Sequence, residues 1–168
     1  MSESLDENLS LNEKRGGALK VYAILSWIYI GITAIGLLMS MVSGPMDAEE
    51  LEQSKVIILE SLDEETVQLV GTDFLKEMIE RLEVANEKHY LILGFNFAVV
   101  VLGFYGVLQM FQLKKNGYYF YLAYSILPAI LEFVHFGNGV LVVFNALFGL
   151  LVSGVFCLLY GLQLKRMQ

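Results

Sequence analysis

Charged residues are scarce in this chain, and four long stretches lack them altogether. Only 17% of the 168 residues are charged, against about 25% in average soluble domains. The uncharged stretches lie between Lys20 and Asp47, between Lys88 and Lys114, between Lys115 and Glu132, and between Glu132 and Lys165. Because about 20 apolar residues suffice to cross the hydrocarbon layer of a bilayer, stretches of this length indicate a membrane protein.

Cysteine is nearly absent as well. Cys157 is the only one, which excludes an internal disulfide and a Cys-x-x-Cys redox mechanism. We interpret it as a small apolar filler of the interior. The chain also lacks a nucleophile–base pair, a phosphate-binding glycine loop and a cofactor fingerprint. The sequence therefore predicts no catalytic residue, no cofactor and no metal, and it favours a non-catalytic protein.

The uncharged stretches predict four transmembrane helices, at residues 18–43, 89–113, 117–136 and 140–163. Gly137, Asn138 and Gly139 form the turn that splits the last stretch, which is too long for one crossing. The remaining segments are the tails, 1–17 and 164–168, and the connections, 44–88, 114–116 and 137–139. We expect an all-α fold, a left-handed antiparallel four-helix bundle, whose first helix is too long for a cleavable signal.

Basic residues predict how the helices are threaded. Seven of the eleven would lie on one side of the membrane if the helices alternate, namely Lys14, Arg15, Lys20, Lys114, Lys115, Lys165 and Arg166. This bias predicts a multi-pass protein of the bacterial inner membrane with both termini in the cytoplasm. An aromatic belt would then mark the cytoplasmic helix ends, formed by Trp27 and by Tyr22, Tyr29, Tyr118, Tyr119, Tyr121 and Tyr160.

The connection at residues 44–88 differs in composition from the spans. It holds thirteen acidic and four basic residues, a net charge of −9 against −7 for the whole chain. We expect an outer helical loop, whose apolar residues Ala48, Leu51, Ile58, Leu59 and Leu62, and then Phe74, Met78, Leu82 and Ala85, fall near helical spacing. Its acidic residues predict a solvated face rather than a cation site.

Local signals predict where these helices begin and end. Gly44 and Pro45 would end the first span, and Asp73 would cap the later loop helix. No proline or glycine separates that helix from the second span. We therefore expect one continuous helix over residues 73–113, about 60 Å long at 1.5 Å per residue.

Polar residues inside the spans are few and suggest one site. Glu132 is the only acidic residue in a span, and His135 lies one turn away. Asn96 and Asn145 fall at a similar depth, and His89 begins the second span. Pro128 removes a hydrogen bond to Tyr124 and predicts a kink. These residues would converge as a polar pocket under the outer membrane surface.

Other interpretations of these residues remain open. Asn96 and Asn145 would serve equally as hydrogen bonds between helices, worth about 0.6–2 kcal/mol. His89 and His135 would serve as interface residues facing water. A Glu-x-x-His metal site needs further ligands that the sequence does not supply. Small residues at helical spacing, including Gly36, Gly103, Gly106 and Gly149, predict close packing of helices before they predict a pore.

One stretch carries a resemblance. "LKKNGYYFYLAYSILPAIL", residues 113–131, is about one-eighth of the chain and enters a span through two lysines, a glycine and aromatic residues. It resembles the small bacterial four-span membrane proteins of unknown function. The resemblance implies the four-span fold. It carries over no activity and no site residue, because lysine and aromatic residues are common wherever a helix enters a membrane.

Together these patterns favour an accessory or assembly subunit. We expect it to bind the lipid bilayer and a membrane or periplasmic protein, through the acidic loop and the small-residue helix faces, and to bind no nucleic acid. The alternatives are a small transporter or channel that uses the polar pocket, and a membrane enzyme acting on lipid or quinone with Glu132 or His135 as the proton carrier.

Overall fold

The computed structural model describes residues 2–61 and 71–167, and every regular element in this part of the chain is a helix, without strands. The helices are α1 (Ser2–Ser43), α2 (Ala48–Glu60), α4 (Thr72–Glu87), α5 (His89–Phe111), α6 (Asn116–Phe136), α7 (Val140–Gly161) and the 3-10 turn η1 (Leu164–Arg166). The predicted all-α fold is therefore confirmed. Leu62 of the predicted apolar spacing lies outside the described residues.

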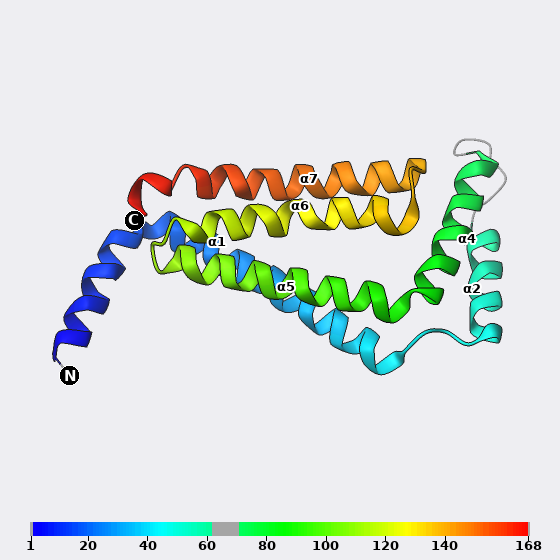
Figure 1. Cartoon of the computed structure of the whole chain (residues 1–168), viewed down its shortest axis with the longest axis horizontal. Coiled ribbons are helices and arrows are strands. Elements are labelled where there is room, and N and C mark those ends of the chain that lie inside the picture. The colour runs from blue at the N-terminus through cyan, green and yellow to red at the C-terminus, as the bar shows by residue number, and fades with distance from the viewer. Residues whose placement is uncertain (1, 62–70, 168) are drawn as a thin grey trace.

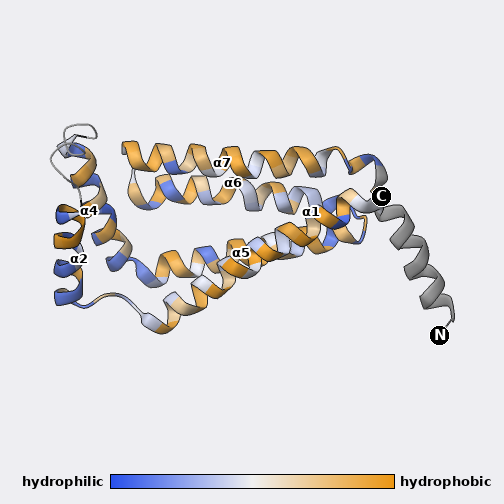
Figure 2. Cartoon of the chain, turned by 180° about the vertical axis from the view of Figure 1, so that it is seen from behind, coloured by the Kyte–Doolittle hydropathy of each residue, from blue (hydrophilic) through white to orange (hydrophobic). Residues whose placement is uncertain are grey.

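Four of these helices are long and apolar enough to cross a membrane, as predicted. They are Gly16–Ser43 within α1, and α5, α6 and α7. Gly16 breaks α1, since its φ of 63° and ψ of 160° are not helical. The four lie roughly along one direction, with both described chain ends at one end of the molecule (Figure 1). Most of their large apolar side chains are exposed, and Figure 2 shows the apolar colour along all four.

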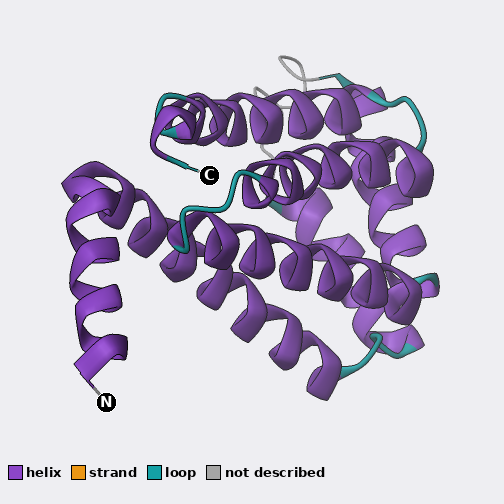
Figure 3. Ribbon diagram, turned by 60° about the vertical axis from the view of Figure 1, so that its left-hand side comes forward, coloured by secondary structure: helices purple, strands orange, loops and turns teal. Residues whose placement is uncertain are grey.

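The helices form an open arrangement rather than an evenly closed one. α5 packs against both α1 and α6, and α6 packs against α7, whereas α1 and α7 touch only sparsely. Figure 3 shows the same helices in an oblique view. α5 and α6 approach closely because Gly106 and Gly117 face each other: a Cβ on Gly106 would lie 2.8 Å from the Tyr121 backbone nitrogen. The predicted packing role of Gly103 and Gly106 is confirmed, whereas a Cβ on Gly36 or Gly149 would meet nothing within 4 Å.

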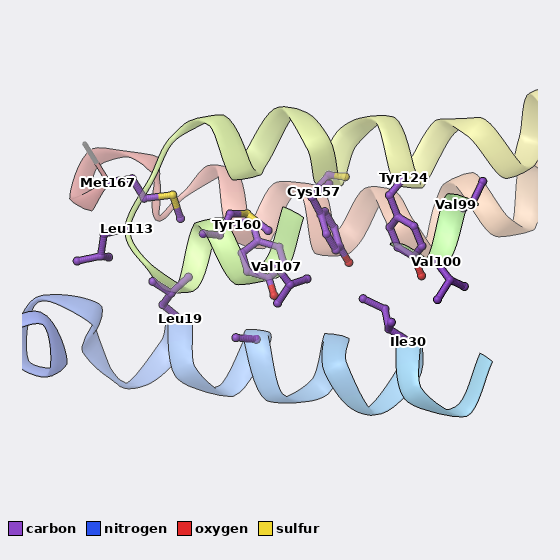
Figure 4. Packing of buried hydrophobic residues seen from close by; sticks show 13 residues of the cluster. Leu19, Ile30, Val99, Val100, Val107, Leu113, Tyr124, Cys157, Tyr160 and Met167 are labelled. Atoms are coloured by element: carbon purple, nitrogen blue, oxygen red, sulfur yellow. The ribbon is translucent and has the colours of Figure 1, made fainter. Parts of the chain in front are cut away.

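The buried core lies between α1, α5, α6 and α7, toward the end where the termini lie (Figure 4). Tyr160 is fully buried, and its hydroxyl lies 3.0 Å from the Ser26 hydroxyl on α1. Tyr121 is buried beside it, with its ring centroid 4.9 Å from that of Tyr160. The predicted aromatic belt is therefore wrong for these two tyrosines, which fill the interior because their rings meet across α6 and α7.

The loop helices lie across the other end of the bundle, with α4 next to the four long helices and α2 beyond it (Figure 1). We call α2 and α4 the cap. Asp47 begins α2 with a capping box: its carboxylate accepts from the Glu50 backbone N–H at 2.9 Å, and Glu50 accepts from the Asp47 N–H at 3.1 Å. The prediction that Asp73 caps α4 is wrong. Gly71 takes the N-cap position, and Asp73 lies in the first turn of the helix.

The predicted continuous helix over residues 73–113 is also wrong. Lys88, with φ −97° and ψ 19°, leaves the helical conformation and separates α4 from α5. The cause is tertiary, because contacts of α4 to other elements hold it across the bundle end. The Asn86 amide, for example, accepts from the Met46 backbone N–H at 2.7 Å and donates to the Met46 carbonyl at 3.0 Å.

Candidate functional site

The candidate site lies where the cap meets α6 and α7, and its centre is an ion pair. The Arg81 guanidinium on α4 donates to a Glu132 carboxylate oxygen on α6 at 2.8 Å. The guanidinium also lies over the Phe136 ring, 4.2 Å from its centroid. The two charged side chains are only 25% and 26% exposed. Glu132 is therefore not an isolated carboxylate that depends on water for solvation, because Arg81 of the cap supplies its counter-charge.

Glu77 makes a second contact one turn before Arg81 on the same helix. Its carboxylate accepts from the backbone N–H of Val142, in the first turn of α7, at 3.2 Å. Gly139, the residue before α7, provides no side-chain cap of its own, so Glu77 satisfies one of the free amides of that terminus. Glycine at position 139 leaves room for this contact, because a Cβ there would displace the Glu77 carboxylate.

A cavity of about 400 Å³ runs beneath this contact, between α1, α6 and α7. Glu132 and Asn145 line one end, and Ser26 and Tyr121 line the other. The walls between them are largely aromatic and aliphatic, and include Tyr124, Pro128, Phe148 and Phe156. Asn145 is exposed as well as lining the cavity. The structure thus brings Glu132 and Asn145 of the predicted pocket to one space.

Three of the predicted pocket residues, His135, His89 and Asn96, do not line this cavity. His135 is buried, with its ring centroid 5.7 Å from that of Phe95. His89 Nε2 lies 3.1 Å from the Ser40 backbone carbonyl oxygen and joins α5 to the end of α1. Asn96 is half-buried on α5. Pro128 lies inside α6, which continues as one helix from Asn116 to Phe136, so the proline does not interrupt it.

Two atoms of the ion pair have unmet hydrogen-bonding capacity. The second Glu132 oxygen, Oε2, and the second Arg81 terminal nitrogen, Nη1, are buried and have no hydrogen-bond partner among the described residues. His135 Nε2 is in the same situation on the neighbouring turn. Buried polar atoms are usually paired, so these three atoms are exceptions at the contact between the cap and α6. Within the described ranges, no three His, Cys, Asp or Glu side chains converge as metal ligands would.

Sequence reasoning missed Arg81 and Glu77, the two residues that carry the cap contact. They are four residues apart and therefore share a face of α4. Opposite charges at that spacing also occur on solvated helices, which is the interpretation that the acidic composition favoured. Only the fold places that face against α6 and α7.

The fold defines the class of the protein: four membrane-capable apolar helices support a multi-pass α-helical membrane protein. Comparisons of the chain with protein-family models, with curated proteins and with solved structures find no match. The argument for function therefore depends on the chain's own residues.

Proposed function

We propose that this protein is a non-catalytic accessory or assembly subunit of a bacterial inner-membrane complex. In this proposal α1, α5, α6 and α7 are an antiparallel transmembrane bundle, and residues 44–88 are an acidic helical cap on the extracytoplasmic side. The kinship with small bacterial four-span membrane proteins belongs to the same proposal. Basic residues near the opposite helix ends support this orientation.

The observation that carries the proposal is an apolar surface on α2. Val56, Ile57 and Leu59 are 48%, 64% and 51% exposed, although they lie in the charged part of the chain outside the spans. No residue of α2 is buried. We call Val56, Ile57 and Leu59 the α2 patch. Exposed apolar surface rimmed by charge is typical of a protein interface, because burying it in a partner removes it from water.

The membrane helices offer a second kind of contact. Gly36 on α1 is exposed and would accept a Cβ without meeting any atom within 4 Å. In the membrane, a small residue on an open face lets a partner helix approach closely. A membrane protein that binds the α2 patch would therefore also find a surface for its own span.

Affinity purification in mild detergent tests the proposal. We expect a stoichiometric protein partner with the wild-type chain, and its loss with Ile57→Glu, which places a charge in the α2 patch. Gln53→Glu on the same helix is the matched control, because Gln53 is exposed and polar. Isolation of the wild-type chain as a monomer or lone homodimer would contradict the proposal. Retention of the partner by Ile57→Glu would remove the α2 patch from it.

The cavity favours a second candidate function, a small transporter or channel. Glu132 and Asn145 at one end of an intramembrane space are the feature that it would use. Flux of a small solute into liposomes that contain the purified chain tests this candidate, and Glu132→Gln would reduce that flux. The third alternative, an enzyme acting on lipid or quinone, has no further support in the geometry.

A further inference from the structure

The cavity between α1, α6 and α7 has the shape of a site for one hydrocarbon chain. Along α6 its lining extends from Tyr121 to Glu132, which is about 16 Å at 1.5 Å per residue. With a volume of about 400 Å³ over that length, the cavity is narrow. The walls offer aromatic rings and aliphatic side chains, which favour an apolar occupant.

The cavity opens sideways, toward the side that faces lipid. Tyr29 on α1 and Phe148 on α7 both line the cavity, and both are more than half exposed. The two helices that carry them touch only sparsely. A molecule dissolved in the bilayer therefore has an entrance between α1 and α7 that does not pass through water.

The polar end of the cavity selects the head group. Glu132 and Asn145 line this end of the cavity. A hydroxyl group complements these two side chains, because it donates to the carboxylate and accepts from the Asn145 amide. The Arg81 pairing neutralises the Glu132 carboxylate from outside the cavity, and the residues that line the cavity include no lysine or arginine. A phosphate head would therefore meet the Glu132 carboxylate without a free cation beside it, so charge complementarity favours an uncharged head.

We propose that this cavity binds an uncharged acylglycerol, with one acyl chain along the Tyr124 and Phe148 walls and a glycerol hydroxyl between Glu132 and Asn145. The orientation agrees with that of a bilayer lipid. Glu132 lies five residues before the turn at Gly137, about 7 Å along the helix, which is the depth of a glycerol group. This inference goes beyond the proposed subunit role and does not depend on it, and binding requires no transport.

Photocrosslinking tests the site with the full chain in phosphatidylcholine nanodiscs. The probe is a diacylglycerol that carries a diazirine in one acyl chain, and peptide mapping should locate the adduct on α6 and α7. Gly149→Leu fills the cavity, because Gly149 lines it and has open space at the Cβ position. Gly154→Leu is the matched control on the same helix: its Cβ position is also open, and it does not line the cavity. We expect about tenfold less adduct with Gly149→Leu, a loss of about 1.4 kcal/mol, and no change with Gly154→Leu.

Competition tests the head group in the same nanodiscs. Unlabelled diacylglycerol should displace the probe, whereas its methyl ether, which cannot donate, should compete about tenfold more weakly. Phosphatidic acid with the same chains should also compete weakly, and Glu132→Gln should reduce the preference for the free hydroxyl. Equal competition by the ether or by phosphatidic acid would overturn the head-group assignment. Unchanged labelling of Gly149→Leu, or adducts spread over all lipid-facing helices, would overturn the site. The purification experiment with Ile57→Glu tests the subunit role alone, and its outcome does not affect the labelling or the competition result.

Discussion

Glu132 and Arg81 show how one residue pair couples the cap to the bundle. Each charge loses solvation at this position, where only about a quarter of each side chain is exposed. The attraction between the two charges offsets part of that desolvation cost. Removing one partner leaves the other charge largely buried without compensation. We therefore expect the removal of either partner to lower the stability of the folded protein more than the loss of an exposed ion pair would.

A double-mutant cycle tests this coupling. Arg81→Met and Glu132→Gln should each destabilise the protein by about 1–3 kcal/mol, and the double variant should lose less than the sum, with a coupling of about 1–2 kcal/mol. Unfolding in detergent measures all four proteins. Lys76→Met is the control, because Lys76 is exposed and lies 3.8 Å from exposed Asp73, and it should cost under about 0.5 kcal/mol. Strict additivity would contradict the coupling.

Lys55 offers a pH test within the cap. Its ammonium donates to Glu52 at 2.7 Å and pairs with Glu83 on α4 at 2.6 Å. These hydrogen bonds, that to Glu52 first, raise the pKa of Lys55 above its ordinary 10.5. Because the folded-state pKa is the higher one, the contribution to stability is complete below pH 10.5 and is lost as the pH rises through the folded-state value.

The measurement is an NMR titration of the Lys55 side chain. We expect a midpoint above 10.5 in the wild type, and a lower midpoint in Glu52→Gln. Glu49→Gln is the control, because Glu49 accepts from Gln53 instead of Lys55. A wild-type midpoint at or below 10.5 would contradict the hydrogen-bonded geometry.

At the scale of elements, glycines decide how closely α5 and α6 pack. A Cβ on Gly106 would meet backbone atoms of Tyr121 and Gly117, and it would lie 3.1 Å from the Gly117 carbonyl oxygen. Backbone cannot rotate away as a flexible side chain can, so the helices themselves would have to separate.

Gly106→Ala should therefore lower stability by about 1–3 kcal/mol, seen as a lower unfolding temperature in detergent. Gly36→Ala is the matched control in a span, because its Cβ position is open and alanine favours helix. If both variants unfold at the wild-type temperature, the close approach of α5 and α6 is not what holds the pair.

Gly139 decides how α4 is held on α7. An alanine there would push the Glu77 carboxylate away from the Val142 amide, which costs about 0.7–1 kcal/mol of helix-terminus stabilisation. Hydrogen exchange should show α4 amides about three- to fivefold faster, with α5 amides unchanged. Gly154→Ala should alter neither. Unchanged exchange in α4 would show that the cap does not depend on Glu77.

At the scale of the whole molecule, the proposed orientation places the cap outside and both chain ends inside. The described ends of the chain lie at the same end of the molecule, away from the cap (Figure 1). The single native cysteine is buried, so an introduced cysteine gives a clean signal. Gln53→Cys in α2 should react with a membrane-impermeant maleimide on intact spheroplasts, whereas a tag after Gln168 should become accessible only after lysis. The reverse pattern would invert the proposed topology.

Sequence patterns predict the spans well because composition alone determines them. A run such as that between Lys88 and Lys114 has no charged residue, and its apolar excess favours a membrane helix whatever its neighbours are. Patterns predict the cap helices and their contacts less well. Helical spacing indicated α4, but nothing near Lys88 in the sequence marks the break, because contacts of α4 to distant residues cause it.

The sequence by itself determined the helical class, the four membrane-capable segments and the acidic composition of residues 44–88, since these follow from local composition and periodicity. Only the tertiary structure decided that Arg81 neutralises Glu132, that Glu77 caps α7, and that His135, His89 and Asn96 stand apart from the cavity that Glu132 and Asn145 line. The Arg81–Glu132 and Glu77–Val142 contacts join residues 51 and 65 positions apart, and helical spacing carries no information about which faces meet at that separation.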